Sequence, residues 1–167
     1  QTILGDLIQG GDVVVLVTPI DLEAPKGRLI LPQVQTIRDI LDNDAISVVV
    51  KERELAFALR QFRMPPKLVV TDSQAVLKVA ADVPHNIKMT TFSILFARYK
   101  GDLAELVKGA KALENLKDGD KVLIGEACTH HALADDIGRV KIPRWIRQYT
   151  GKDIGFEVAS GFSFPDN

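Results

Sequence analysis

The 167-residue sequence predicts an α/β fold with mostly parallel sheets, arranged as two small consecutive domains. Apolar, β-branched runs alternate with segments of helical periodicity, which is the pattern of helices covering parallel strands. Most of these runs are almost continuously apolar, as expected for strands buried on both faces; the last alternates and belongs nearer an edge. The expected strands are 12–17, 45–50, 67–71, a short one at 88–90, 121–124 and 154–158.

Helical segments separate the strands of the first half. Pro32 stands where a first-turn proline belongs, and apolar residues follow it on one face. A second helix covers 54–59 and stops before the prolines at 65–66. Asp72 or Ser73 is expected to cap a third helix, which ends before Pro84.

Three further helices are expected in the second half. The first starts near Thr91 and breaks at 99–102; it has apolar residues on more than one face, which fits either a fully buried central helix or a subunit interface. The second covers 103–113. The third begins at Ile142 and ends with Gly151 as its C-cap. We place the domain boundary in or near the second of these helices, so that the domains are 1–101 and 102–167.

Composition excludes several classes of function. The 21 basic and 22 acidic residues leave a net charge of −1, which argues against nucleic acid as the main partner. No apolar run approaches the roughly 20 residues of a membrane-spanning helix, and no signal peptide is visible. The single cysteine, Cys128, excludes an internal disulfide and fits a reducing compartment, so we expect a cytoplasmic protein. One thiolate cannot hold an iron–sulfur cluster alone.

The strongest candidate site is the segment from Glu126 to His131, directly after the expected strand 121–124. Ligand sites of open α/β sheets lie beyond the carboxyl ends of strands. Cys128 and His130, two positions apart, can face one metal, and a thiolate suits iron–sulfur or zinc. Two other interpretations remain open: a buried structural cysteine with ordinary loop histidines, or a cysteine nucleophile paired with His130 or His131.

Other polar segments have weaker signals. Residues 135–147 place Asp135 and Asp136 before four cations, Arg139, Lys141, Arg144 and Arg147, around the only tryptophan. They form either a solvated helix face or a charged lip around Cys128, where an aspartate could offer an oxygen ligand. Residues 21–28 match no phosphate-loop motif and are expected to be a surface loop or interface lip. His85 is expected in an exposed turn.

Several motifs together resemble the HydF family of FeFe-hydrogenase maturation GTPases. The resemblance covers essentially the whole chain. The segments that carry it are 17–21 (VTPID), 24–33 (APKGRLILPQ), 69–74 (VVTDSQ), 92–102 (FSILFARYKGD), 126–131 (EACTHH) and 135–145 (DDIGRVKIPRW).

The resemblance implies a dimerisation domain at 1–101 and an iron–sulfur cluster-binding domain at 102–167, continuing beyond Asn167. The family's GTP-binding domain, and with it GTP binding, would lie outside this sequence. Cys128 and His130 match the family's C-x-H element and become the expected ligands of a 4Fe-4S cluster, whose other cysteines have no match here.

The function implied by the resemblance is that of a homodimeric scaffold. It would accept a di-iron precursor from two radical-SAM maturases and deliver it to apo-hydrogenase, and no catalysis is expected from these residues themselves. Two alternatives remain open: a small-molecule enzyme on an α/β sheet with Cys128 as nucleophile, and a purely structural dimerisation module.

Overall fold

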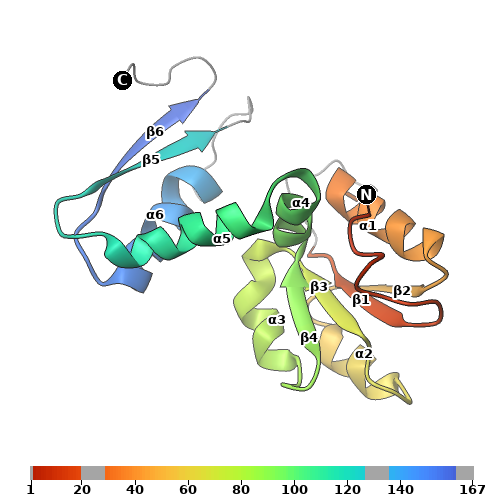
Figure 1. Cartoon of the computed structure of the whole chain (residues 1–167). Helices are drawn as coiled ribbons and strands as arrows, with labels where there is room; N and C mark the ends of the chain where they lie inside the picture. The colour runs from red at the N-terminus through yellow and green to blue at the C-terminus, as the bar shows by residue number, and fades with distance from the viewer. Residues whose placement is uncertain (1, 20–28, 127–135, 161–167) are drawn as a thin grey trace. The chain divides into compact units, whose positions relative to one another are not determined.

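The computed structural model describes residues 2–19, 29–126 and 136–160, and the chain divides into two compact units, Gln1–Leu103 and Ala104–Asn167 (Figure 1). Both units combine parallel strands with helices, so the predicted α/β class is confirmed. The two units are described one at a time below.

The first unit is built on a four-stranded parallel sheet. Its strands are β1 (Val13–Val17), β2 (Ile46–Val50), β3 (Leu68–Thr71) and β4 (Lys88–Thr91), in the spatial order β2-β1-β3-β4. Val15 of β1 aligns with Val48 of β2 and with Val69 of β3. The short strand expected at 88–90 is therefore confirmed as β4.

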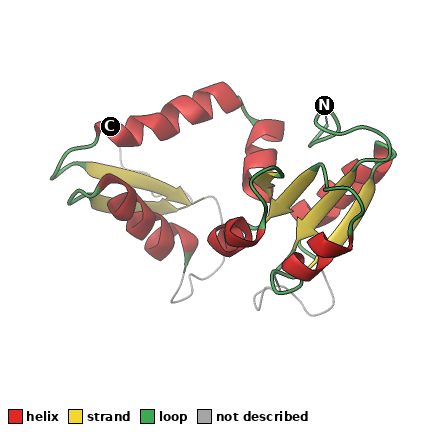
Figure 2. Cartoon of the chain, turned by 90° about the horizontal axis from the view of Figure 1, so that it is seen from below, coloured by secondary structure: helices red, strands yellow, loops and turns green. Residues whose placement is uncertain are grey.

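Helices cover both faces of this sheet (Figure 2). On one face, α1 (Leu31–Asp42) and α4 (Phe92–Lys100) bury Ile40, Phe92 and Leu95 against alternate residues of β1 and β3. On the other face, α2 (Leu55–Gln61) and α3 (Val76–Asp82) bury Leu55 and Val79. Strands β1 and β3 are thus buried on both sides, which explains their continuous apolar runs.

The expectation of burial on both faces is wrong for β2. This strand lies at the edge of the sheet, and Ile46 and Val49 are 51% and 43% exposed. An apolar run records that a strand is hydrophobic but not how many neighbours it has, so composition could not separate β2 from β1.

The polar residues after β3 bond differently from the cap that the sequence predicts. Asp72 precedes a 3-10 turn, η1 (Ser73–Ala75), but its side chain makes no cap hydrogen bond. Instead its Oδ2 accepts a 2.9 Å bond from Nε2 of the buried Gln33, and Ser73 Oγ lies 2.6 Å from Ser93 Oγ. Long-range partners thus replace the local cap.

Helix α4 begins where the sequence predicts it. Thr91 is its N-cap, and the threonine hydroxyl accepts a 3.2 Å bond from the Ile94 N–H. Phe92 and Leu95 are buried while Ile94 is 50% exposed, so the alternative of a fully buried central helix is wrong.

In the described part of the second unit, two parallel strands form a sheet, β5 (Lys121–Glu126) and β6 (Gly155–Ser160). The chain enters it through α5 (Leu103–Ala112) and a 3-10 turn, η2 (Leu113–Asn115). Between the strands come a π-helical turn, η3 (Ile137–Lys141), and α6 (Ile142–Thr150), which ends at Gly151 with a left-handed φ of 66°. The predicted glycine C-cap is confirmed.

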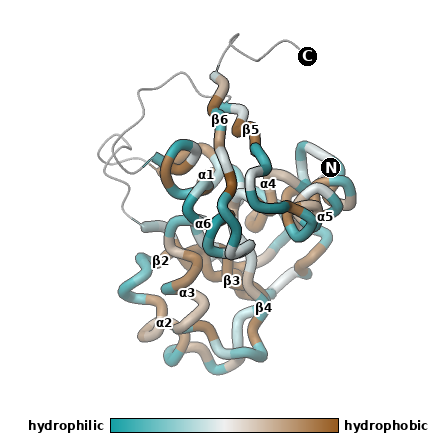
Figure 3. The backbone as a smooth tube through the Cα atoms, turned by 90° about the vertical axis from the view of Figure 1, so that its left-hand side faces the viewer, coloured by the Kyte–Doolittle hydropathy of each residue, from teal (hydrophilic) through white to brown (hydrophobic). Residues whose placement is uncertain are grey.

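Among the residues with described positions, each strand of this small sheet has one neighbour, and both strands carry hydrophobic and hydrophilic residues (Figure 3). Leu123 of β5 is 47% exposed and Val158 of β6 is 36% exposed. Burial of β5 on both faces, which its apolar run predicts, is therefore wrong as well. A sheet of two strands leaves part of its apolar surface uncovered.

Candidate functional site

The predicted ligands Cys128 and His130 lie outside the described residues, as do His131, Asp135 and the loop 21–28. Their immediate flanks are described. Glu126 is the last residue of β5, and Asp136 leads into η3. The cysteine segment therefore begins at the carboxyl edge of a parallel sheet, which is where α/β folds place ligand sites.

Arg139 joins the two flanks of this segment. Its Nε and Nη2 donate to the two carboxylate oxygens of Glu126 at 3.2 and 3.0 Å, a bidentate arrangement. Its backbone N–H donates to Oδ1 of Asp136 at 2.8 Å. We call Glu126, Asp136 and Arg139 the clamp, because one arginine holds residues ten positions apart in the sequence.

The electrostatics of the clamp favour its charged form. The hydrogen bonds that Arg139 donates to Glu126, followed by the charges of Glu126 and Asp136, raise the pKa of Arg139 above its ordinary value. The Glu126 side chain is only 15% exposed, whereas that of Arg139 is 51% exposed. Arg139, which follows the cysteine segment, is thus the counter-ion of Glu126, which precedes it.

A glycine gives the clamp room. A Cβ at Gly138 would lie 3.1 Å from Glu126 Oε1 and 3.4 Å from Asp136 Oδ1. Contacts this short are rarely tolerated without displacement, so a side chain at 138 would push the carboxylates away. Sequence reasoning did not identify Gly138 or the pairing of Glu126 with Arg139, since neither follows from a motif.

Two of the four cations that follow Asp135 and Asp136 in the sequence have partners within their own unit. Arg139 is paired with Glu126, and Arg147 donates two bonds, 2.9 and 3.1 Å, to the Ile154 carbonyl while its guanidinium lies 4.9 Å from the Phe156 ring centre. Two of the four cations therefore have structural roles. Arg144 is exposed and Trp145 is half-buried.

Other predicted polar positions are accounted for. His85 lies exposed in the turn between α3 and β4, as expected. Within the described ranges, no group of three or more His, Cys, Asp and Glu side chains is placed to hold a metal ion. The same ranges contain no helix long and apolar enough to cross a membrane.

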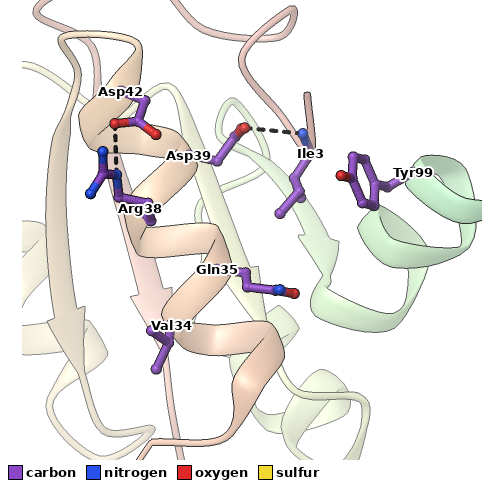
Figure 4. A pocket seen from close by; sticks show the side chains of 7 residues that line it. All are labelled: Ile3, Val34, Gln35, Arg38, Asp39, Asp42 and Tyr99. Atoms are coloured by element: carbon purple, nitrogen blue, oxygen red, sulfur yellow. Dashed lines mark hydrogen bonds and ion pairs between the residues drawn. The ribbon is translucent and has the colours of Figure 1, made fainter. Parts of the chain in front are cut away.

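A hollow of about 330 Å³ in the first unit lies beside α1 (Figure 4). Its residues come from the N-terminal segment, α1 and α4: Ile3, Val34, Gln35, Arg38, Asp39, Asp42 and Tyr99. Arg38 and Asp42 pair with each other at 2.7 Å, and Asp39 accepts bonds from three backbone N–H groups, those of Ile3, Leu4 and Gly5. Asp39 therefore fastens the N-terminal segment to α1, whereas the Arg38–Asp42 pair lies within the helix.

Comparison with known families assigns both units. The model of the hydrogen maturase F dimerization domain matches residues 3–101, and that of the hydrogen maturase F tetramerization domain matches residues 104–167. No curated protein matches the chain. A solved structure from a study of fatty acyl-adenylate ligases of E. coli and L. pneumophila aligns at 13% identity and a TM-score of 0.40; the alignment covers 93% of this chain and 32% of that one.

Proposed function

Because the chain belongs to the hydrogen maturase F family, we propose that it is the oligomeric scaffold of a hydrogenase maturation factor. The observation that carries this proposal is the succession of a dimerization and a tetramerization domain over nearly all of its length. These domains give the chain a role in hydrogenase maturation and in self-association, and they confirm the family that the sequence motifs indicate.

The edge strand β2 is our candidate for the dimer contact. It is five residues long, ISVVV, without proline or charge, and no strand covers its outer side among the described residues. Natural edge strands usually carry charge, proline or bulges that prevent pairing with another chain. Pairing with β2 of a second copy would bury Ile46 and Val49 and extend the sheet across the dimer axis.

This contact is tested with Val49→Lys, which places a charge on the exposed edge. We expect the chain to change from dimer-based assemblies to monomers in light scattering, with unchanged far-ultraviolet circular dichroism. Leu77→Lys is the matched control, since Leu77 on α3 is even more exposed, at 82%. Monomers from the control and dimers from Val49→Lys would assign the contact to the α2–α3 face instead.

We further propose that Cys128 and His130 contribute ligands to a 4Fe-4S cluster. Support comes from the soft thiolate donor and from the two described flanks of their segment, which the clamp joins at the carboxyl end of β5. The donors of this sequence fit one part of such a cluster only: Cys128 is its single cysteine, so further thiolates must come from elsewhere. The cargo would be the di-iron precursor, received from radical-SAM maturases and delivered to apo-hydrogenase.

The proposal does not assign GTP hydrolysis to these 167 residues. The 167 residues contain no G-x-x-x-x-G-K-[ST] phosphate loop, so the family's GTPase activity is assigned to a separate domain.

The cluster proposal is tested by anaerobic reconstitution of the natural protein with iron and sulfide. Cys128→Ser should abolish the broad visible absorption of the cluster. His130→Ala should keep most of the iron and alter the electron paramagnetic resonance of the reduced cluster, whereas the exposed His85→Ala should alter neither. A full cluster in Cys128→Ser would remove this cysteine from the ligand set.

A further inference from the structure

Helix α5 has an apolar face that is exposed among the residues the structure describes. Its apolar residues follow the 3-4-3 spacing of a coiled-coil seam, at Leu103, Leu106, Ala110 and, in the next turn, Leu113. Val107 lies beside the seam. None of the ten residues of α5 is buried, and Leu106 and Val107 are 48% and 45% exposed.

The opposite face of α5 is polar and solvated. Lys108 and Glu105 pair across it at 3.6 Å, with side chains 78% and 70% exposed. Such a division is typical of a helix that packs on one side only. The side of α5 that packs against a partner is therefore the seam of Leu103, Leu106, Ala110 and Leu113.

The described part of the second unit buries few apolar side chains. Among its described residues, the buried apolar side chains of the strands and their flanks are Ile124, Ile154 and Ala159. A two-stranded sheet is marginal in water unless other elements cover it. A unit of this kind gains its missing hydrophobic contacts by association.

We propose that α5 pairs antiparallel with α5 of a second copy across a two-fold axis, and that this contact joins two dimers into a tetramer. The inference rests on the proposed function, because the tetramerization family model begins at residue 104, in the first turn of this helix. A two-fold contact must be self-complementary, and this sequence is. With the axis at position 108, Leu103 faces Leu113 of the second copy and Leu106 faces Ala110, a large side chain against a small one.

Gly109 gives independent support. Glycine inside a helix costs about 1 kcal/mol relative to alanine. A Cβ at Gly109 would meet no atom of the described residues within 4 Å, so their packing does not require glycine there. In the antiparallel pair, position 109 of each copy lies on the same flank of the seam as position 109 of the other, where the absence of side chains allows the helices to approach closely.

The test measures the assembly state of the full chain by native mass spectrometry and light scattering across a dilution series. For Leu106→Glu we expect dimers in place of tetramers, with a tetramer–dimer dissociation constant raised at least about 100-fold. Lys108→Glu, on the polar face of the same helix, is the matched control and should leave the tetramer intact.

Gly109→Ala separates assembly from folding. Alanine favours the helix, so a weaker tetramer in this variant with unchanged or greater helicity cannot be attributed to unfolding. We expect its tetramer to dissociate at about tenfold higher concentration than the wild type.

The remaining outcomes are distinct. A tetrameric Leu106→Glu variant overturns the inference and leaves the proposed function standing. If Leu106→Glu stays tetrameric but its first unit unfolds more easily, the seam packs against the first unit of the same chain, and this result also overturns the inference. A wild-type chain that never forms tetramers would contradict the proposed function itself.

Discussion

Asp39 is the residue that holds the N-terminal segment against α1. Its carboxylate accepts backbone bonds from Ile3, Leu4 and Gly5 at 2.9–3.2 Å and hydroxyl bonds from Thr2 at 2.7 and 2.8 Å. Burial disfavours the charged form, but the bonds from Leu4, Thr2 and the other donors outweigh it and lower the pKa of Asp39. The N-terminal segment, whose Ile3 and Leu4 lie in the core, is therefore held by an ionised side chain.

Asp39→Asn should lower the free energy of unfolding by about 1–3 kcal/mol at pH 7, because a charged acceptor of several bonds is lost. The wild-type contribution is fully present above the unfolded pKa of about 3.9 and is lost as the pH falls through the lower, folded pKa. Urea denaturation at pH 7 and below pH 4 should thus show the gap between wild type and variant closing with acid.

Asp42→Asn is the control for this prediction, since Asp42 makes an exposed ion pair with Arg38 on the same helix. Such pairs contribute little, so its effect should stay below about 1 kcal/mol. Equal losses in the two variants would contradict the role assigned to Asp39.

The clamp makes a second prediction for single residues. Glu126→Gln removes the charge that binds Arg139 but keeps the shape of the side chain. Because Arg139 is half exposed, we expect little change in global stability and a faster hydrogen exchange of the amides in 136–141. Exchange mass spectrometry checks this, with Glu157→Gln on the neighbouring strand as control. Unchanged protection would mean that Arg139 does not hold the segment.

Single residues also show where sequence reasoning ends. Gly151 follows from a local rule and was predicted, because a helix C-terminus needs a left-handed residue. The bond from Gln33 to Asp72 joins residues 39 positions apart, so only the folded sheet could reveal it. The roles of Cys128 and His130 stay predictions that rest on the family motif.

At the scale of elements, the end of α6 offers a sharp prediction. Gly151 has φ 66° and open space around it, so Gly151→Ala introduces backbone strain without a clash. We expect a loss of about 1 kcal/mol in the stability of the second unit. Gly151→Asn should cost less, since asparagine tolerates this conformation. Chemical denaturation followed by Trp145 fluorescence measures both, and equal costs would contradict the explanation.

Strands and helices were largely predictable, but their environments were not. The apolar runs located β1 to β6 because hydrophobic periodicity is a local signal. Exposure of β2 and β5 depends on strand order, which is set by how the connecting helices cross the sheets. The same limit applies to α4, whose exposed Ile94 becomes visible only when its neighbours are known.

At the scale of the whole molecule, the described parts of the two units differ in how many apolar side chains they bury. The first has two hydrophobic clusters, one on each face of its sheet, whereas the second has a few buried residues around two strands. We therefore expect the second unit to depend on assembly for its stability.

Dilution should expose this difference. As tetramers dissociate, hydrogen-exchange protection of β5 and β6 should fall, while β1 and β3 stay protected until the chain unfolds globally. Lys108→Glu serves as control, because it should follow the wild type at every concentration. Constant protection of β5 and β6 after dissociation would show that the second unit is stable alone.

The parallel pairing of β5 with β6 brings the carboxyl ends of both strands to one edge of the small sheet. Glu126 lies opposite Ser160, so residues more than thirty positions apart in the sequence are neighbours there. In an antiparallel pair, the end of β6 would instead lie beside the start of β5, at the far edge from the clamp. Ser160 is therefore the residue of β6 through which a change in that strand would reach Glu126 most directly.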